Sequence, residues 1–176
     1  MARASTKENK NIYQQLREEQ KWSRDKASQE LGTIPPERIE RIESGRFNAH
    51  PDEVVLMTEK YKAPQLCNYY CANECEIGRQ HVPEVRIKDL AQIVLEMLSS
   101  LNSAKRNQER LIDITADGVI ENDEIDDFIG IQDNLEKISL TVEALRLWSE
   151  KMLADGKIDL DAYKEAKKRK QDVGVH

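Results

Sequence analysis

Large apolar residues recur at a helical spacing over two long stretches in the second half of the chain. Between Leu90 and Leu101 they follow the i, i+3, i+4, i+7 pattern of an amphipathic helix. Between Ile131 and Met152 they alternate mostly in steps of four and three residues, the spacing of coiled coils and antiparallel bundles. Because a β-strand repeats its side-chain direction every two residues, these stretches predict two long helices that pack on other helices.

The composition of the chain also favours helices. Aromatic residues make up 5% and charged residues 34% of the 176 residues. The core must therefore consist mainly of aliphatic side chains, and the helices can carry solvated outer faces. The seven glycines and five prolines fall at expected element ends. The sequence therefore predicts an all-α protein.

The charge of the chain is unevenly distributed. The formal net charge is −6, with 12 Lys and Arg against 11 Asp and Glu in residues 1–64, and 15 against 22 in residues 65–176. A protein that binds polyanions without sequence preference is far more basic. Any contact with nucleic acid must therefore come from a local patch in the first half.

No segment predicts export or membrane insertion. No apolar run approaches the about 18 residues that a transmembrane helix needs, and the first residues lack the charged and apolar regions of a secretory signal. The three cysteines are an odd number, and reduced thiols are the default for a chain without an export signal. We expect a cytoplasmic protein with no membrane partner.

Four short helices are predicted in the first 64 residues. None is long enough to be stable alone, so they must pack in one compact bundle that ends near Pro64. Serine and proline suit helix starts, whereas glycine suits helix ends because it adopts a positive φ angle. The expected starts are at Ser5, Ser23, Pro35-Pro36 and His50-Pro51, and two expected ends are at Gly32 and Gly45.

The second and third of these helices have the pattern of a helix-turn-helix, in which a short turn joins two helices and often begins with glycine. The segment from Trp22 to Gly32, followed by Ile42-Glu43-Ser44-Gly45, resembles the XRE family of Cro/repressor-type domains. In that family an apolar-Glu-x-Gly signature ends the recognition helix. The resemblance covers about residues 10–64 and implies a sequence-specific DNA-binding transcriptional regulator.

The resemblance also implies which residues would contact double-stranded DNA. In the family, early residues of the recognition helix touch base edges, while the start of the preceding helix and the loop after the glycine touch phosphates. This chain departs from the pattern in two ways, because Thr33 lengthens the turn and two carboxylates on the recognition helix repel phosphates. By position, the base-reading residues would be Pro36, Glu37, Glu40 and Arg41, the phosphate-binding residues would be Ser23, Arg24, Arg46 and Asn48, and Arg38 would help to offset the carboxylates.

A second interpretation keeps the same bundle but gives it a protein partner, as in an antitoxin-like or adaptor module. An enzyme is not expected. The sequence contains no pairing of a nucleophile with a base and no phosphate-binding loop, and the three histidines, at positions 50, 81 and 176, are scattered.

The segment from 65 to 85 contains all three cysteines. Cys67, Cys71 and Cys75 are spaced four residues apart and would share one face of a helix. With His81 they supply enough ligands for a zinc ion or an iron–sulfur cluster. The alternative is that the thiols are small apolar groups in a protein core.

Two Asp-Gly turns flank the second long helix. The first, from Asp113 to Glu124, resembles an EF-hand loop, with Thr115 in place of the usual acidic third ligand. The favoured alternative is a corner between two helices, in which Gly118 supplies a positive φ angle and Asp113 or Asp117 caps a helix. The second turn, around Asp155-Gly156, lacks the necessary ligands, so we expect no tight calcium binding. Both turns place a β-branched residue after the glycine, which predicts that Ile120 and Ile158 pair as short strands.

These features predict a repressor-like helix-turn-helix bundle in residues 1–64, a cysteine-containing short helix and linker in residues 65–85, and a bundle of long helices in residues 86–176. The last part would mediate dimerisation or receive a signal. Two-fold symmetry doubles the contacts of a helix-turn-helix on a palindromic site, so we expect a homodimer.

Overall fold

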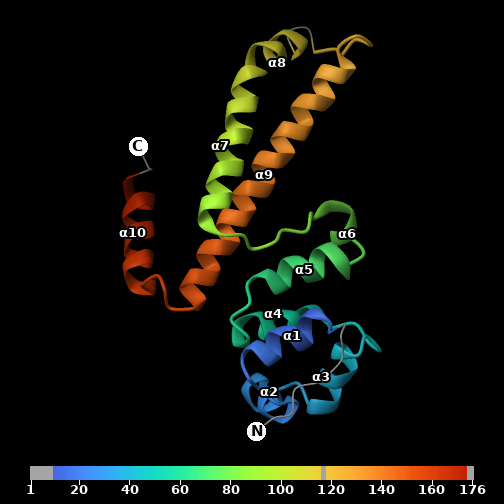
Figure 1. The fold of residues 1–176 in the computed structure, drawn as a ribbon, viewed down its shortest axis with the longest axis vertical. Coiled ribbons are helices and arrows are strands. Elements are labelled where there is room, and N and C mark those ends of the chain that lie inside the picture. Colours follow the sequence, from blue (N-terminus) through green and yellow to red (C-terminus); the bar gives the residue numbers. More distant parts are fainter. Residues whose placement is uncertain (1–9, 116–117, 174–176) are drawn as a thin grey trace. The chain divides into compact units, whose positions relative to one another are not determined.

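The computed structural model describes residues 10–115 and 118–173, and every regular element in these ranges is a helix (Figure 1). The predicted all-α fold is confirmed. The chain divides into a first unit, Met1–Glu84 with Glu150–His176, and a second unit, Val85–Ser149. The helices are α1 Ile12–Glu19, α2 Arg24–Leu31, α3 Pro36–Glu43, α4 Pro51–Lys60, α5 Gln65–Asn73, α6 Gly78–His81, α7 Leu90–Arg106, α8 Gln108–Thr115, α9 Ile125–Ala154 and α10 Leu160–Val173.

The start of α1 is set by Asn11. Its Oδ1 accepts a hydrogen bond from the N–H of Gln14 at 3.0 Å, and its Nδ2 donates to the carbonyl oxygen of Ile42 at 2.8 Å. One side chain thus caps α1 and ties it to α3. The predicted cap at Ser5 lies outside the described residues.

The helix ends around α2 and α3 follow the sequence prediction. The hydroxyl of Ser23 accepts a hydrogen bond from the N–H of Lys26 at 3.1 Å, which caps α2. Gly32 and Gly45 have φ angles of 74° and 73°, a region that residues with a Cβ rarely adopt. Pro36 occupies the first turn of α3, where a missing N–H costs no helical hydrogen bond.

The core of the first unit extends beyond Pro64. Leu66 of α5 is fully buried among residues of α1 to α4, and Cys67, Tyr69 and Tyr70 pack against the same cluster. The short helix predicted after Pro64 is thus α5, and it packs into the core of the first bundle, which was expected to end near residue 64. An apolar side chain in each turn of α5 makes this helix a fifth member of the first core.

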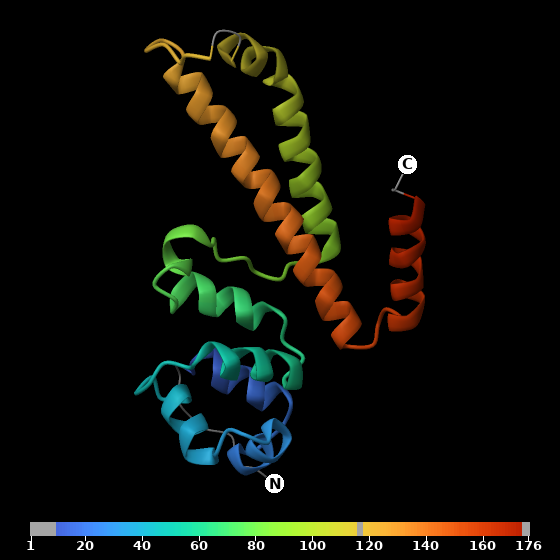
Figure 2. The same cartoon turned by 180° about the vertical axis from the view of Figure 1, so that it is seen from behind.

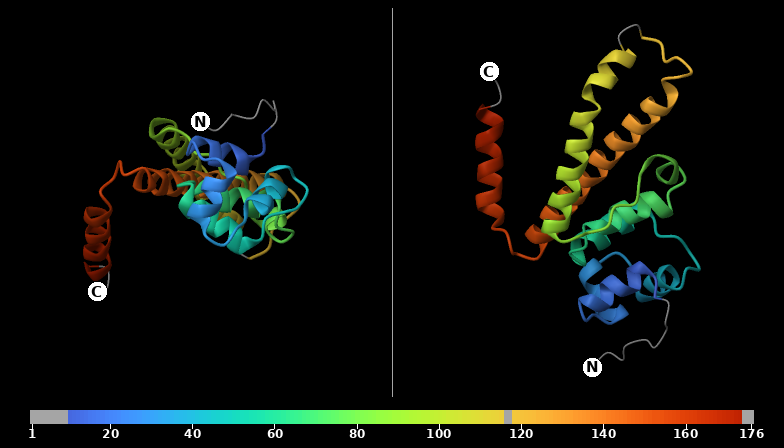
Figure 3. Two further views of the ribbon diagram at one scale, coloured as in Figure 1. Left: turned by 90° about the horizontal axis from the view of Figure 1, so that it is seen from below. Right: turned by 45° about the horizontal axis from the view of Figure 1, so that its top comes forward.

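The second unit is an antiparallel hairpin of α7 and α9, closed at one end by α8 (Figures 1 and 2). Near the start of α7, Val85 and Ile93 pack on Ala144 and Leu147 of α9. Near the start of α9, the Nε of Arg110 on α8 donates to Asp127 at 2.7 Å. The views in Figure 3 follow the same path from α7 through α8 to α9.

The predicted strand pairing of Ile120 with Ile158 is wrong. One continuous helix of 30 residues, α9, lies between the two turns, and at 1.5 Å per residue it separates them by about 45 Å. Ile120 is also exposed, and the described residues contain no strand. The Asp-Gly turns therefore lie at opposite ends of one helix.

No described helix is both long and apolar enough to cross a membrane. The described side chains of α10 include no buried one.

The contact between α5 and α6 depends on a glycine. Gly78 is buried, and a Cβ built on it would lie 2.1 Å from the carbonyl oxygen of Cys71. Real atoms do not approach so closely, so a side chain would force the two helices apart. Glycine is therefore required where the chain returns against α5.

We expect Gly78→Ala to lower the free energy of unfolding of the first unit by about 1–3 kcal/mol, the usual cost of overpacking. Gly130→Ala is the matched control, because Gly130 lies in α9 with nothing within 4 Å of its added Cβ. Alanine should stabilise that helix by about 0.5–1 kcal/mol. Urea denaturation followed by fluorescence, with Trp22 reporting the first unit and Trp148 the second, measures both effects. Equal stability of Gly78→Ala and the parent protein would contradict the close packing.

Candidate nucleic-acid interface

The turn from Gly32 to Pro35 holds α2 and α3 at a fixed angle. Ile34 in this turn is buried, together with Ala27 on α2 and Ile39 and Ile42 on α3. These apolar side chains belong to the same cluster as α1 and α4. The opposite sides of α2 and α3 consequently remain accessible.

The outer side of α3 exposes two of the predicted base-reading residues, Glu37 and Arg41. They are four residues apart, and on a helix this spacing places them one above the other. The loop after α3 exposes two predicted phosphate-binding residues, Arg46 and Asn48. The other predicted residues are half-buried, namely Ser23, Arg24, Pro36, Arg38 and Glu40.

The side chain of Glu43, at the end of α3, is 1% exposed and forms a buried ion-pair network. Its carboxylate accepts hydrogen bonds from Arg17 Nε at 2.5 Å, Arg17 Nη2 at 3.1 Å and Arg24 Nε at 2.9 Å. Arg17 also donates to the carbonyl oxygen of Trp22 at 2.5 Å. The network therefore ties α3 to α1, to the α1–α2 turn and to the start of α2.

Burial alone would lower the pKa of Arg17, but the hydrogen bond and negative charge of Glu43 raise it above its ordinary value. Arg17 therefore stays protonated although its side chain is 7% exposed. Arg24, predicted to hold a phosphate, shares this carboxylate and is 40% exposed at its side chain. The hydrogen bond to Glu43 uses Nε of Arg24, so the other N–H groups of its guanidinium are not part of this contact.

Arg38 makes a second ion pair that serves the fold. Its guanidinium group binds both oxygens of Glu53, at 2.8 and 2.7 Å, and donates to the carbonyl oxygen of Asn48 at 2.9 Å. Glu53 in turn accepts from the N–H of His50 at 2.7 Å and caps α4. Partial burial would raise the pKa of Glu53, but the hydrogen bonds from Arg38 and His50 hold it below its ordinary value. Arg38 thus connects α3 to α4. The sequence had instead suggested that it offsets the carboxylates on the DNA-facing side of α3.

The two exposed arginines of the interface have weaker contacts. The guanidinium carbon of Arg41 lies 5.6 Å from the ring centre of Phe47, a cation–π distance. Arg46 lies 3.5 Å from Glu40, and the arginine side chain is 69% exposed. Such surface contacts break at little cost, so both guanidinium groups can turn to a ligand.

Sequence reasoning missed the role of Arg17 and the position of Phe47. Nothing in the segment around Arg17 indicates a partner 26 residues later. The available signal was Glu43, which directly follows the inward-facing Ile42. A carboxylate on the inner side of a helix needs a buried cation as its partner. Phe47 is 54% exposed in the loop after α3.

The structure does not bring the four predicted metal ligands together. Cys67 Sγ lies 3.2 Å from the hydroxyl of Thr58, and Cys75 Sγ accepts from the N–H of Gly78 at 3.5 Å. Burial raises the pKa of the Cys71 thiol, and the neighbouring Cys75 and Cys67 raise it further. His81 is exposed at the end of α6. Within 10–115 and 118–173, no three His, Cys, Asp or Glu side chains group as metal ligands would.

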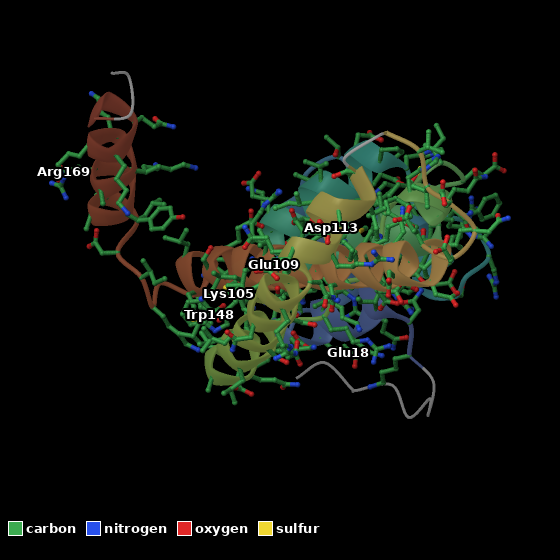
Figure 4. All side chains as sticks on the ribbon, turned by 90° about the horizontal axis from the view of Figure 1, so that it is seen from above. Glu18, Lys105, Glu109, Asp113, Trp148 and Arg169 are labelled. Atoms are coloured by element: carbon green, nitrogen blue, oxygen red, sulfur yellow. The ribbon has the colours of Figure 1, made fainter. Side chains whose placement is uncertain are left out.

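The segment that resembles an EF-hand loop also lacks the expected geometry. Asp113, its first ligand position, lies within helix α8 (Figure 4). Thr115, its third ligand position, is the last residue of the same helix. The hydroxyl of Thr115 donates to the carbonyl oxygen of Leu111 at 2.8 Å. Asp117, the fifth ligand position, lies outside the described residues. Asp113 and Thr115 thus lie in a helix, and Gly118 has a φ angle of 76°, as the alternative of a turn between two helices predicts.

Comparisons with known proteins give no relative. No model of a protein family matches the chain, and no match is found among curated proteins or solved structures.

We expect Glu43→Ala to lower the free energy of unfolding of the first unit by about 3–5 kcal/mol, because it leaves the buried Arg17 without a counter-charge. Glu37→Ala is the matched control on the exposed side of α3 and should change stability by less than about 0.5 kcal/mol. Urea denaturation in a Trp148→Phe background, with Trp22 as the reporter, provides the measurement. If the two alanine variants were equally stable, Glu43 would not be the link between α1, α2 and α3.

Proposed function

We propose that the first unit binds double-stranded DNA with sequence preference and that the protein is a transcriptional regulator. The observation that carries the proposal is the contrast between the two sides of α3. Its inner side is fixed by Ile39, Ile42 and the buried Glu43 network, while its outer side exposes Glu37 and Arg41. A short helix held in this way suits insertion into the major groove.

The exposed side chains of α3 offer hydrogen-bonding groups that distinguish bases. An arginine such as Arg41 donates two hydrogen bonds to O6 and N7 of guanine, and a carboxylate such as Glu37 accepts from the amino group of cytosine. Pro36 and Glu40 would border this contact. Each good bidentate contact contributes about 1–3 kcal/mol of discrimination between bases.

Phosphate contacts would come from the flanks of α3. Arg46 and Asn48 are exposed in the loop after the helix, and the exposed part of Arg24 lies at the start of α2. Ser23 caps α2 and orients the N–H groups of its first turn, which attract anions. Because residues 1–64 carry nearly balanced charges, few phosphates would be neutralised and the dependence on salt would be shallow.

The second unit would join two copies or receive a signal, and the proposal includes no catalytic step. An alternative is an antitoxin-like or adaptor protein that uses the first unit to bind another protein. Phe47 and Val55 favour this alternative, since they are 54% and 61% exposed on the first unit and exposed apolar residues are common in protein interfaces.

We expect the full chain to enrich a preferred sequence from a pool of random duplexes at low salt. Arg41→Ala should weaken binding to that sequence about 10-fold or more and relax the choice at one base position. Arg46→Ala should weaken binding to all sequences similarly, because phosphates carry no sequence information. Fluorescence anisotropy with labelled duplexes measures these affinities.

Arg79→Ala is the matched control, because Arg79 is an exposed arginine on α6 in the same unit. It should leave both affinity and sequence choice unchanged. Absence of any enriched sequence from the pool would refute the DNA-binding proposal and favour a protein partner.

A further inference from the structure

The last helix, α10, carries a dense run of positive charge. Five of the seven residues from 164 to 170 are Lys or Arg and one is Glu, in a chain of net charge −6. We call these five residues the basic segment: Lys164, Lys167, Lys168, Arg169 and Lys170. The acidic excess of residues 65–176 as a whole conceals this segment, which is why a nucleic-acid contact was expected only in the first half.

Local hydrogen bonds fix the start of α10. The carboxylate of Asp159 accepts from the N–H of Ala162 at 2.7 Å and caps the helix. In the turn before it, Gly156 has a φ angle of 69°, and its N–H donates to the carbonyl oxygen of Leu153 at 3.0 Å. This turn joins α10 to the last residues of α9, and both belong to the first unit, which also contains α3.

The basic segment is not neutralised by the protein itself. All five side chains are exposed, and none forms an ion pair with a carboxylate among the described side chains. Basic residues are common in the last turn of a helix, where they interact favourably with the helix dipole. Only Lys170 is in the last turn of α10, so the dipole does not account for the rest of the segment.

The charge of the basic segment opposes the helix that carries it. Lys164 is three residues from Lys167 and four from Lys168, and like charges at these spacings destabilise a helix. Helix α10 has 14 residues, and none of its described side chains is buried to offset this repulsion. Isolated helices of about 12–15 residues are marginal in water. A bound polyanion would remove the repulsion and stabilise the helix.

The positive charges surround α10 instead of lining one face. Successive residues of a helix are turned by about 100°, so the four residues from Lys167 to Lys170 encircle the axis. Side chains leave α10 on several sides, one of which carries Arg169 (Figure 4). A helix that lies on a membrane needs an apolar face, but the one apolar residue from 164 to 170 is Ala166. An acidic protein surface would meet only one side of the helix.

We propose that α10 binds in the major groove of double-stranded DNA and contacts the phosphates on both edges of the groove, without reading bases. The groove is about 12 Å wide and admits an α-helix, whose diameter with side chains is about 10–12 Å. Phosphates on both edges match cations on all sides of the helix. Double-stranded RNA offers no such site, because its major groove is too narrow for side chains to enter. This contact goes beyond the function proposed for α3, since it requires no preferred sequence.

Fluorescence anisotropy of the full chain with a labelled duplex of arbitrary sequence tests the proposal, at salt concentrations from about 50 to 200 mM. Each phosphate contact steepens the fall of log affinity with log salt by about 0.9, so α10 should add to the shallow dependence expected from α3. The double variant Lys168→Gln/Arg169→Gln should bind about 10-fold or more weakly and lower this slope by about 2. Glutamine is a good helix former, so circular dichroism should show no loss of helicity.

Lys105→Gln/Arg106→Gln is the matched control, because it removes an adjacent, exposed Lys and Arg from the end of α7 and changes the net charge equally. It should bind the duplex as tightly as the parent chain. An equal loss of affinity in both double variants would overturn the proposal, as would unchanged affinity of Lys168→Gln/Arg169→Gln. A loss confined to vesicles that contain phosphatidylserine, tested in parallel, would overturn it in favour of a membrane partner.

The outcomes separate this proposal from the function proposed for α3. Duplex binding that requires the basic segment but selects no sequence would support the role of α10 and refute only that of α3. A selected sequence that Lys168→Gln/Arg169→Gln binds as tightly as the parent chain would refute only the role of α10.

Discussion

The buried carboxylate of Glu43 is the interaction on which the first unit depends. A charge in a protein interior is costly unless its oxygens are fully occupied, and here Arg17 and Arg24 supply three hydrogen bonds from two other helices. Arg17 also donates through Nη1 to the carbonyl oxygen of Trp22. Helices α1, α2 and α3, each eight residues long, are thereby held in one arrangement.

The apolar core of the first unit stabilises the bundle but does little to fix the rotation of each helix about its axis. It consists mostly of leucine, isoleucine, alanine and valine side chains, and such a core tolerates small rotations of a helix. The carboxylate of Glu43 tolerates smaller rotations, because hydrogen bonds weaken as their donors move out of line. Ile39 and Ile42 bury α3, and Glu43 fixes its rotation, so Glu37 and Arg41 face outward in a defined direction. Recognition of a base edge requires that degree of positioning.

Local signals in the sequence predicted the helices well, and contacts between distant segments were not predictable. Ser23, Gly32 and Gly45 act through neighbours within a few residues, so their roles could be recognised in the chain. Arg38 was expected on the outer surface because its partner, Glu53, follows 15 residues later and belongs to another helix. The cysteine spacing indicated a shared helix face, but the face packs partly against the core, with Cys67 beside Thr58. The pairing of Ile120 with Ile158 failed because α9 is continuous and rigid between them.

In the second unit, fewer apolar side chains are buried in a common cluster than in the first. Its helices are long, yet the buried cluster that joins them is small and consists of Val85, Ile93, Ala144 and Leu147, with Ile87, Leu140, Leu145 and Trp148 packed against it. Hydrophobic stabilisation is roughly proportional to the apolar area removed from water, so a small cluster contributes little of it. The heptad residues that would normally supply it, such as Leu135 and Val142, remain exposed. The first unit, in contrast, has a core that joins side chains of α1 to α5.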